Sequence, residues 1–183
     1  ELWAGKGVVV PEDLPAAHKA LFDFYDNPTY PVRPQELVLE ARLTGRELSA
    51  FALCDGRDFL YLGEACDYKR LRDGGRGPNT GGMGAHPPEE GFPSARARQR
   101  IQEEIIPRTL AGMAQEGMPF KGFLFVGLMI DGDKVNVVEF NARFGDPETE
   151  CVLPLLEGDL LEIFLAATDG KLSGVDFHVK PGA

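Results

Sequence analysis

Two potential metal ligands lie two residues apart in the segment from Val135 to Glu148. If this segment begins as a strand, its side chains alternate between two faces, so Glu139 and Asn141 point to the same side about 7 Å apart. A carboxylate and an amide oxygen at this spacing can bind Mg²⁺, which takes one or two protein oxygens and completes its octahedron with water and substrate phosphate. A continuing strand also places Arg143 on this face, where its guanidinium can bind phosphate. The alternative is a strand end whose polar side chains contact only water, and the spacing alone leaves both open.

A pair of carboxylates, Glu40 and Glu47, is separated by a short segment that contains Gly45. A segment that leaves one lobe and enters another offers backbone groups to the edge of an adenine ring. A carboxylate that follows can accept hydrogen bonds from ribose hydroxyls. The alternative is two solvated glutamates beside a hairpin, and this pair alone favours that alternative.

The segment Gly5-Lys6-Gly7 can bind phosphate, because glycines let backbone N–H groups approach an anion and Lys6 supplies positive charge. It does not follow the GxxxxGK[ST] pattern of a P-loop, so this signal is weak by itself.

A basic segment stands out against a net charge of −10. The overall charge argues against a nucleic acid or an anionic membrane as a partner. Between Cys66 and Gly77, however, four basic residues accompany two acidic ones. The following Pro78-Asn79-Thr80 is stiffer than the glycines around it and offers hydrogen-bond donors. This loop can close over a phosphorylated or carboxylate ligand; the alternative is a flexible surface loop.

The elements that position these residues combine helices and hairpins. We expect strands at 7–10, 37–39, 47–53, 59–63, 123–130 and 135–140, helices at 11–25, 94–115, 147–156 and 159–167, and a long loop at 73–88. The helix from Ser94 is expected to kink at Pro107 and to bury Ile101, Ile105 and Met113. Asp146-Pro147 is typical of a helix N-cap followed by a first-turn proline. The mixture predicts an α+β fold with helices on a largely antiparallel sheet.

Composition is that of a globular protein, with 43% hydrophobic and 26% charged residues. The three cysteines are scattered, which argues against a disulfide scaffold and favours the cytoplasm. No run approaches the roughly 20 apolar residues of a membrane span. The first residue is Glu1 rather than methionine, and we expect the chain to be a fragment of a longer protein.

Four segments together resemble the phosphoribosylamine–glycine ligase family, in family order and across essentially the whole chain. They are Gly5-Lys6-Gly7-Val8, Asp67-Tyr68-Lys69-Arg70, the stretch GPNTGGMGA at 77–85, and RFGDPE at 143–148. The last two are specific to the family, whereas GKG is not. The resemblance implies an ATP-grasp fold, in which ATP lies between two α+β lobes. Residues 1–40 would be the remainder of the smaller lobe, 41–172 the larger lobe, and 173–183 a linker, with the amino- and carboxy-terminal domains missing.

The resemblance also implies a reaction in which ATP, glycine and 5-phosphoribosylamine give glycinamide ribonucleotide, ADP and phosphate through a glycyl phosphate. It assigns ATP contacts to Lys6, Gly7, Glu40, Arg42 and Glu47, and Mg²⁺ or Mn²⁺ to Glu139 and Asn141. Lys6 and Arg143 would be catalytic. Substrate contacts would come from Asp67, Lys69, Asn79, Thr80, Arg143, Asp146 and Glu148.

Three departures from the family pattern concern substrate contacts and loop mobility. They are Glu150 in place of glutamine, Tyr68 in place of histidine, and Glu1-Leu2-Trp3 before the glycine segment. Two alternatives remain: another ATP-grasp carboxylate–amine ligase, and a nucleotide-binding module without turnover.

Overall fold

The computed structural model describes residues 8–26 and 37–180. The chain divides into two compact units, Glu1–Leu43 and Thr44–Ala183, which are described separately. This division falls three residues after the boundary expected between the lobes. The assignment of the two units to the lobes of an ATP-grasp fold stays a prediction.

The described part of the first unit contains one helix, α1 (Leu14–Asp26), which confirms the helix expected at 11–25. Asp13 caps its first turn, because its Oδ1 atom accepts from the backbone N–H of Ala16 at 2.8 Å. Residues 8–10 and 37–39, which we expected to be strands, have no strand conformation. A strand requires a pairing partner, and the described residues supply none to either segment.

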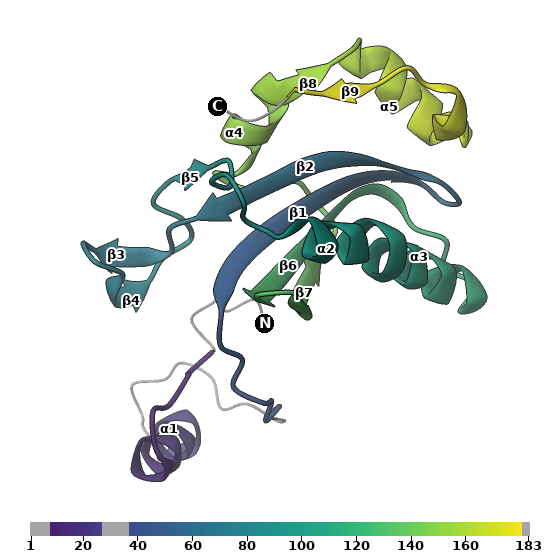
Figure 1. The fold of residues 1–183 in the computed structure, drawn as a ribbon. Coiled ribbons are helices and arrows are strands. Elements are labelled where there is room, and N and C mark those ends of the chain that lie inside the picture. Colours follow the sequence, from purple (N-terminus) through teal and green to yellow (C-terminus); the bar gives the residue numbers. More distant parts are fainter. Residues whose placement is uncertain (1–7, 27–36, 181–183) are drawn as a thin grey trace. The chain divides into compact units, whose positions relative to one another are not determined.

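The second unit is built on a five-stranded antiparallel sheet in the order β5-β2-β1-β6-β7 (Figure 1). The strands are β1 (Arg46–Asp55), β2 (Phe59–Asp67), β5 (Ala85–His86), β6 (Lys121–Asp131) and β7 (Lys134–Asn141). The predicted β1–β2 and β6–β7 hairpins are therefore confirmed. Asp55 fixes the first turn, since its Oδ1 accepts from the N–H groups of Arg57 and Asp58 at 2.9 and 2.7 Å.

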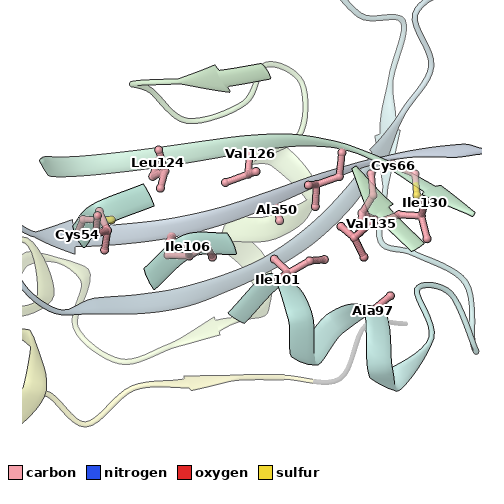
Figure 2. Packing of buried hydrophobic residues seen from close by; sticks show 14 residues of the cluster. Ala50, Cys54, Cys66, Ala97, Ile101, Ile106, Leu124, Val126, Ile130 and Val135 are labelled. Atoms are coloured by element: carbon pink, nitrogen blue, oxygen red, sulfur yellow. The ribbon is translucent and has the colours of Figure 1, made fainter. Parts of the chain in front are cut away.

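One face of the sheet is covered by a long helical segment (Figure 2). This segment comprises α2 (Ala95–Arg100), the π-helical turn η1 (Ile101–Ile105) and α3 (Ile106–Gln115). The alternate residues of β1 and β6, including Ala50, Cys54, Leu124 and Val126, pack against Ala97, Ile101 and Ile106. Ser94 caps α2, as predicted, by accepting from the N–H of Ala97 at 3.1 Å.

The π turn alters which helical residues are buried. The N–H of Ile106 donates to the carbonyl of Ile101, five residues earlier, immediately before Pro107. This wider turn brings Ile106 and then Leu110 over the sheet. Ile105, expected to be buried, only packs partly against this core, and Met113 is also only partly buried.

The opposite face of the sheet is apolar over half of its length. Phe51, Leu53 and Phe125 pack there against Val152, Ile163 and Ala167. The covering elements are α4 (Thr149–Val152) and α5 (Leu160–Asp169). Asp159 caps α5, because its Oδ1 accepts from the N–H of Leu161 at 2.8 Å. The rest of this face carries polar side chains.

The helix expected at 147–156 is shorter than predicted. Glu148, and not Asp146, is the N-cap residue of α4. A 3₁₀ turn, η2 (Leu153–Leu155), follows at once and leads into β8 (Leu156–Glu157). Pro154 has no N–H to continue an α-helical hydrogen-bond pattern, which accounts for the early end.

The carboxy-terminal part contains the 3₁₀ turn η3 (Leu172–Gly174) and β9 (His178–Val179), which pairs with β8. Part of the segment expected to be a linker thus belongs to the second unit, where β9 pairs with β8. None of the helices in the described ranges has the length and apolar character needed to cross a bilayer.

The long loop expected at 73–88 has more regular structure than predicted. Its first part forms a small hairpin with the residues before it, in which β3 (Arg70–Arg72) pairs with β4 (Arg76–Asn79) and Arg70 lies opposite Asn79. Gly74 and Gly75 form its turn with φ values of +68° and +67°. These values lie in the left-handed region that glycine adopts without steric cost, so the glycines specify a turn here.

Candidate functional site

The polar end of one sheet face gathers most of the predicted site residues. Strand alternation places Glu47 on the same face as Phe51, and the β1–β2 register extends this face to Asp67. The register also aligns Ser49 with Gly127 and Gly127 with Glu139 across three neighbouring strands. The site is therefore a shallow row of side chains from β1, β2 and β7.

Glu139 and Asn141 lie side by side on this face, as their spacing predicted. The side-chain amide of Asn141 donates to Glu139 Oε1 at 3.1 Å. Gly127 provides the room for Glu139, because a Cβ atom at this glycine would lie 3.0 Å from Glu139 Cγ. Both side chains are at least partly exposed, so their oxygens are accessible to a ligand.

The donor set of this pair fits Mg²⁺ or Mn²⁺. A carboxylate and an amide supply oxygen ligands, and such ions complete their coordination with water and phosphate. Within the described ranges there is no group of three or more His, Cys, Asp or Glu side chains that would hold a metal ion by itself. A metal bound here depends on oxygens that a substrate provides, so the metal role stays a prediction.

Lys69 joins two carboxylates of the row. Its Nζ atom lies 2.9 Å from Glu47 Oε2 and 3.5 Å from Asp67 Oδ1. Burial raises the pKa of Asp67, Lys69 lowers it, and the charges of Glu148 and Glu47 raise it again, with a net increase. Burial opposes the charge of Lys69, but its hydrogen bond to Glu47 and the charges of both carboxylates raise its pKa overall. The cluster therefore consists of one lysine held between two carboxylates.

Glu148 is buried beside this cluster, with only 2% of its surface exposed. Its Oε1 atom accepts from the hydroxyl of Ser49 at 3.0 Å. Gly145 is required for this conformation, because a Cβ atom there would lie 2.6 Å from Glu148 Oε2. The segment after β7 thus folds back over the sheet, and the buried carboxylate of Glu148 lies in the row.

Arg143 lies beyond the end of β7 but still over the same face. Its guanidinium carbon is 5.7 Å from the centre of the Phe125 ring, and Nη1 donates to the carbonyl of Phe144 at 2.8 Å. The side chain is exposed, so its remaining N–H groups are available for a phosphate or carboxylate.

The glycine-rich loop docks on the segment that carries Glu148. Thr80 Oγ1 donates to the carbonyl of Lys69 at 2.9 Å and accepts from the N–H of Gly82 at 3.2 Å. A Cβ atom at Gly82 would lie 2.6 Å from Pro147 Cδ, so this contact requires glycine. The loop and the Asp146–Glu148 segment therefore adjoin one another at the site.

Several predicted residues are not placed in this row. Lys6 and Gly7 lie outside the described residues, as does the side chain of Asn79. Glu40 and Arg42 belong to the first unit, where Arg42 Nη1 donates to the carbonyl of Pro11 at 3.4 Å. Asp146 is exposed next to the row.

The sequence reasoning missed Ser49, Gly127 and Gly145. Ser49 has a signal, since it is two residues after Glu47 in a strand and must share its face. Gly127 gave no such signal, because its role depends on Glu139 in the neighbouring strand. Gly145 lies in the RFGDPE stretch, but no role was assigned to it.

The sequence matches a known protein family over most of its length. The family model described as "Phosphoribosylglycinamide synthetase, ATP-grasp (A) domain" matches residues 1–149. The phosphoribosylamine–glycine ligase of Chlorobaculum tepidum is 45% identical over 182 residues, which are 100% of this chain and 43% of that protein. The trifunctional purine biosynthetic protein adenosine-3 of Gallus gallus is 43% identical over 172 residues, covering 94% of this chain and 17% of that protein.

A solved structure of one such ligase has a similar fold. The crystal structure of phosphoribosylamine–glycine ligase from Thermotoga maritima superposes with a TM-score of 0.63 at 43% identity. The match covers 70% of this chain and 32% of that one. The chain thus spans less than half the length of each of these relatives.

Antiparallel strands, flanking helices and a polar row at one sheet end are those of an ATP-grasp domain, and the predicted α+β class is confirmed. Within that class, the chain belongs to the phosphoribosylglycinamide synthetase ATP-grasp domain family.

Proposed function

We propose that this chain is the central ATP-binding part of a phosphoribosylamine–glycine ligase, which joins glycine to 5-phosphoribosylamine in purine biosynthesis. The observation that carries the proposal is the row on the sheet face, in which the Glu139–Asn141 pair lies on the same face as Glu47, Asp67 and Lys69. The remaining parts of the ligase would come from amino- and carboxy-terminal domains outside this chain.

Nucleotide binding is assigned to residues of both units. Lys6 and Gly7 would cover the phosphates, while Glu40 and the backbone near Arg42 would meet the adenine. Glu47 would accept from the ribose hydroxyls. Glu139 and Asn141 would hold Mg²⁺ or Mn²⁺, which when bound neutralises charge on the transferred phosphate.

The proposed reaction has two steps. A carboxylate oxygen of glycine attacks the γ-phosphorus of ATP, the bond to ADP breaks, and glycyl phosphate forms. The amine of phosphoribosylamine then attacks the glycyl carbonyl, phosphate leaves, and the amine loses a proton as the amide forms. Phosphoryl transfer depends mainly on positioning and charge neutralisation, for which Lys6 and Arg143 are suited.

Substrate contacts are assigned to the polar row and to the loop docked on it. Arg143 would bind the carboxylate or the phosphate through its planar fork of donors. The other substrate-binding residues would be Asp67, Lys69, Asn79, Thr80, Asp146 and Glu148. The docked glycine loop would keep water from the acyl phosphate, which water would otherwise hydrolyse.

A reducing compartment suits this protein. Cys54 and Cys66 are buried thiols, and burial raises their pKa values to about 12 and about 11. Cys151 is a free, partly buried thiol. We therefore assign the protein to the cytoplasm.

The test is glycine dependence of ATP turnover in a complete protein carrying this sequence. ADP release should require glycine and phosphoribosylamine together with Mg²⁺ or Mn²⁺. Turnover with a different carboxylate substrate would indicate another ATP-grasp ligase. ATP binding without turnover under any of these conditions would indicate a nucleotide-binding module.

A further inference from the structure

Ser49 and Glu148 form a buried hydrogen bond that the proposed roles do not account for. Ser49 is 3% exposed and Glu148 is 2% exposed, and the hydroxyl donates to Oε1 at 3.0 Å. The two residues lie 99 positions apart in the chain. A hydroxyl that binds one oxygen of a carboxylate fixes the direction of the other oxygen.

That second oxygen, Oε2, is free to meet a ligand. Among the described residues, no donor lies within hydrogen-bonding distance of Glu148 Oε2. Glu148 retains 2% exposure, and no fully buried side-chain oxygen of the described residues lacks a partner, so Oε2 is the oxygen through which Glu148 can meet a ligand. Gly145 keeps the space next to it free of a side chain.

The surroundings of Oε2 favour a cation. The side chain of Asp67 is 4% exposed, and its carboxylate senses the charge of Glu148. Lys69 is the one cation in ion-pair contact with Asp67 among the described residues, and it also binds Glu47. Lys69 is thus divided between Asp67 and Glu47, and among the described residues no cation is in ion-pair contact with Glu148. A ligand ammonium group would balance the negative charge of these carboxylates.

The chemistry of the two amine substrates distinguishes between them. The amine of phosphoribosylamine is the nucleophile and needs a free electron pair, which adjacent carboxylates would oppose by favouring its protonated form. The ammonium group of glycine does not react and carries a positive charge at neutral pH. Buried carboxylates therefore suit glycine.

We propose that Ser49 is a positioning residue, which holds Glu148 so that Oε2 accepts a hydrogen bond from the ammonium group of glycine. This inference rests on the proposed function, and it adds a residue and an orientation that the function alone does not supply. Ser49 itself touches no substrate.

The experiment compares Ser49→Ala and Ser49→Thr in a complete protein carrying this sequence. The alanine variant should raise KM for glycine roughly 10- to 100-fold, because a hydrogen bond to a charged group is lost. KM for ATP should change less than about threefold. Threonine retains the hydroxyl and suits a strand, so Ser49→Thr should stay within about fivefold of the unaltered protein.

A matched control is Ser94→Ala. The Ser94 hydroxyl also donates to a carboxylate, Asp133 Oδ1 at 2.6 Å, but it caps α2 away from the row. This variant should lower thermal stability and leave KM for glycine unchanged.

A second measurement remains informative if Ser49→Ala does not fold. Glycolate carries a hydroxyl where glycine carries its ammonium, so the unaltered protein should prefer glycine. Glu148→Gln removes the negative charge and keeps an acceptor for Ser49, and it should reduce the preference for glycine at least tenfold.

An unchanged KM for glycine in Ser49→Ala, an equal rise in KM for ATP, or an unchanged preference in Glu148→Gln would each overturn the inference. The proposed function is tested separately by the unaltered protein, whose failure to turn over ATP with glycine would refute that function whatever the variants do.

Discussion

Lys69 Nζ lies 2.9 Å from Glu47 Oε2, so a residue assigned to the amine substrate is paired with a residue assigned to the nucleotide. The Lys69 and Glu47 side chains are 40% and 52% exposed, respectively, and such a pair contributes only about 0–1 kcal/mol. It therefore separates easily when a ligand competes for either partner.

Lys69→Ala should spare ATP binding and impair use of phosphoribosylamine. Glu47 retains its carboxylate in this variant, whereas the basic contact to the sugar phosphate is lost. Steady-state kinetics should show a higher KM for the amine or a lower kcat. Lys171→Ala removes an ion pair that is more exposed, at 3.0 Å from Asp169, and should change neither. Equal losses toward ATP and amine would place Lys69 at the nucleotide instead.

Glu47→Ala should weaken ATP binding about tenfold, because the ribose hydroxyls lose a charged acceptor. Calorimetric titration with a non-hydrolysable ATP analogue measures this directly. Lys69→Ala serves as the control, since it also breaks the pair but leaves the carboxylate. An unaltered affinity in Glu47→Ala would rule out the ribose contact.

Glu139→Gln should reduce Mg²⁺-dependent turnover by a factor of 100 or more while leaving the Tm within a few degrees. The carboxylate is exposed and its neutral substitute fits the same space beside Gly127, so folding has little dependence on its charge. A titration of activity with Mg²⁺ and with Mn²⁺, after removal of metal by a chelator, provides the measurement. Asn136→Ala on the same strand should behave like the unaltered protein; a Glu139→Gln variant with normal metal dependence would contradict the metal role.

Gly145→Ala should abolish most turnover. The added Cβ atom would lie 2.6 Å from Glu148 Oε2, so the carboxylate has to leave its position. Overpacking of this kind costs about 1–3 kcal/mol, which thermal unfolding will detect. The control is Gly174→Ala, where a Cβ atom meets nothing within 4 Å. If Gly145→Ala retained full activity, the position of Glu148 would be irrelevant to the reaction.

Asp67→Asn should stabilise the fold at neutral pH while lowering activity. The pKa of Asp67 is raised above 3.8, mainly by burial, so the ionised form costs folding free energy at pH 7. This cost disappears as the pH falls through the raised pKa and the carboxyl becomes protonated. The excess Tm of Asp67→Asn over the unaltered protein should therefore be largest near pH 7 and shrink toward pH 4. A difference that grew on acidification would show that the ionised carboxylate is stabilising.

Local patterns in the sequence were sufficient to predict the parts of the fold that depend on neighbours in the chain. The hairpin of β6 and β7 follows from alternation and a short glycine turn, and the cap at Ser94 follows from its position before a helix. The shared face of Glu139 and Asn141 was predictable for the same reason, because side chains two residues apart in a strand point to the same side.

Features that depend on distant segments were not predictable in this way. The partner of Ser49 is 99 residues away, and Gly82 matters only because Pro147 lies against it. The π turn at Ile101–Ile105 shifts the buried residues by one position, which a regular period cannot express. The apolar pattern continues past the end of α4, but the helix ends there because Pro154 has no N–H for a helical hydrogen bond.

The contact between Gly82 and Pro147 links two segments that are far apart in the chain and has a consequence for their evolution. Their atoms are so close that a side chain on one requires a compensating change in the other. Among homologous sequences, these two positions should covary as a pair. In a chimera, the glycine-rich loop and the Asp146–Glu148 segment should be exchangeable only together, as one inherited module.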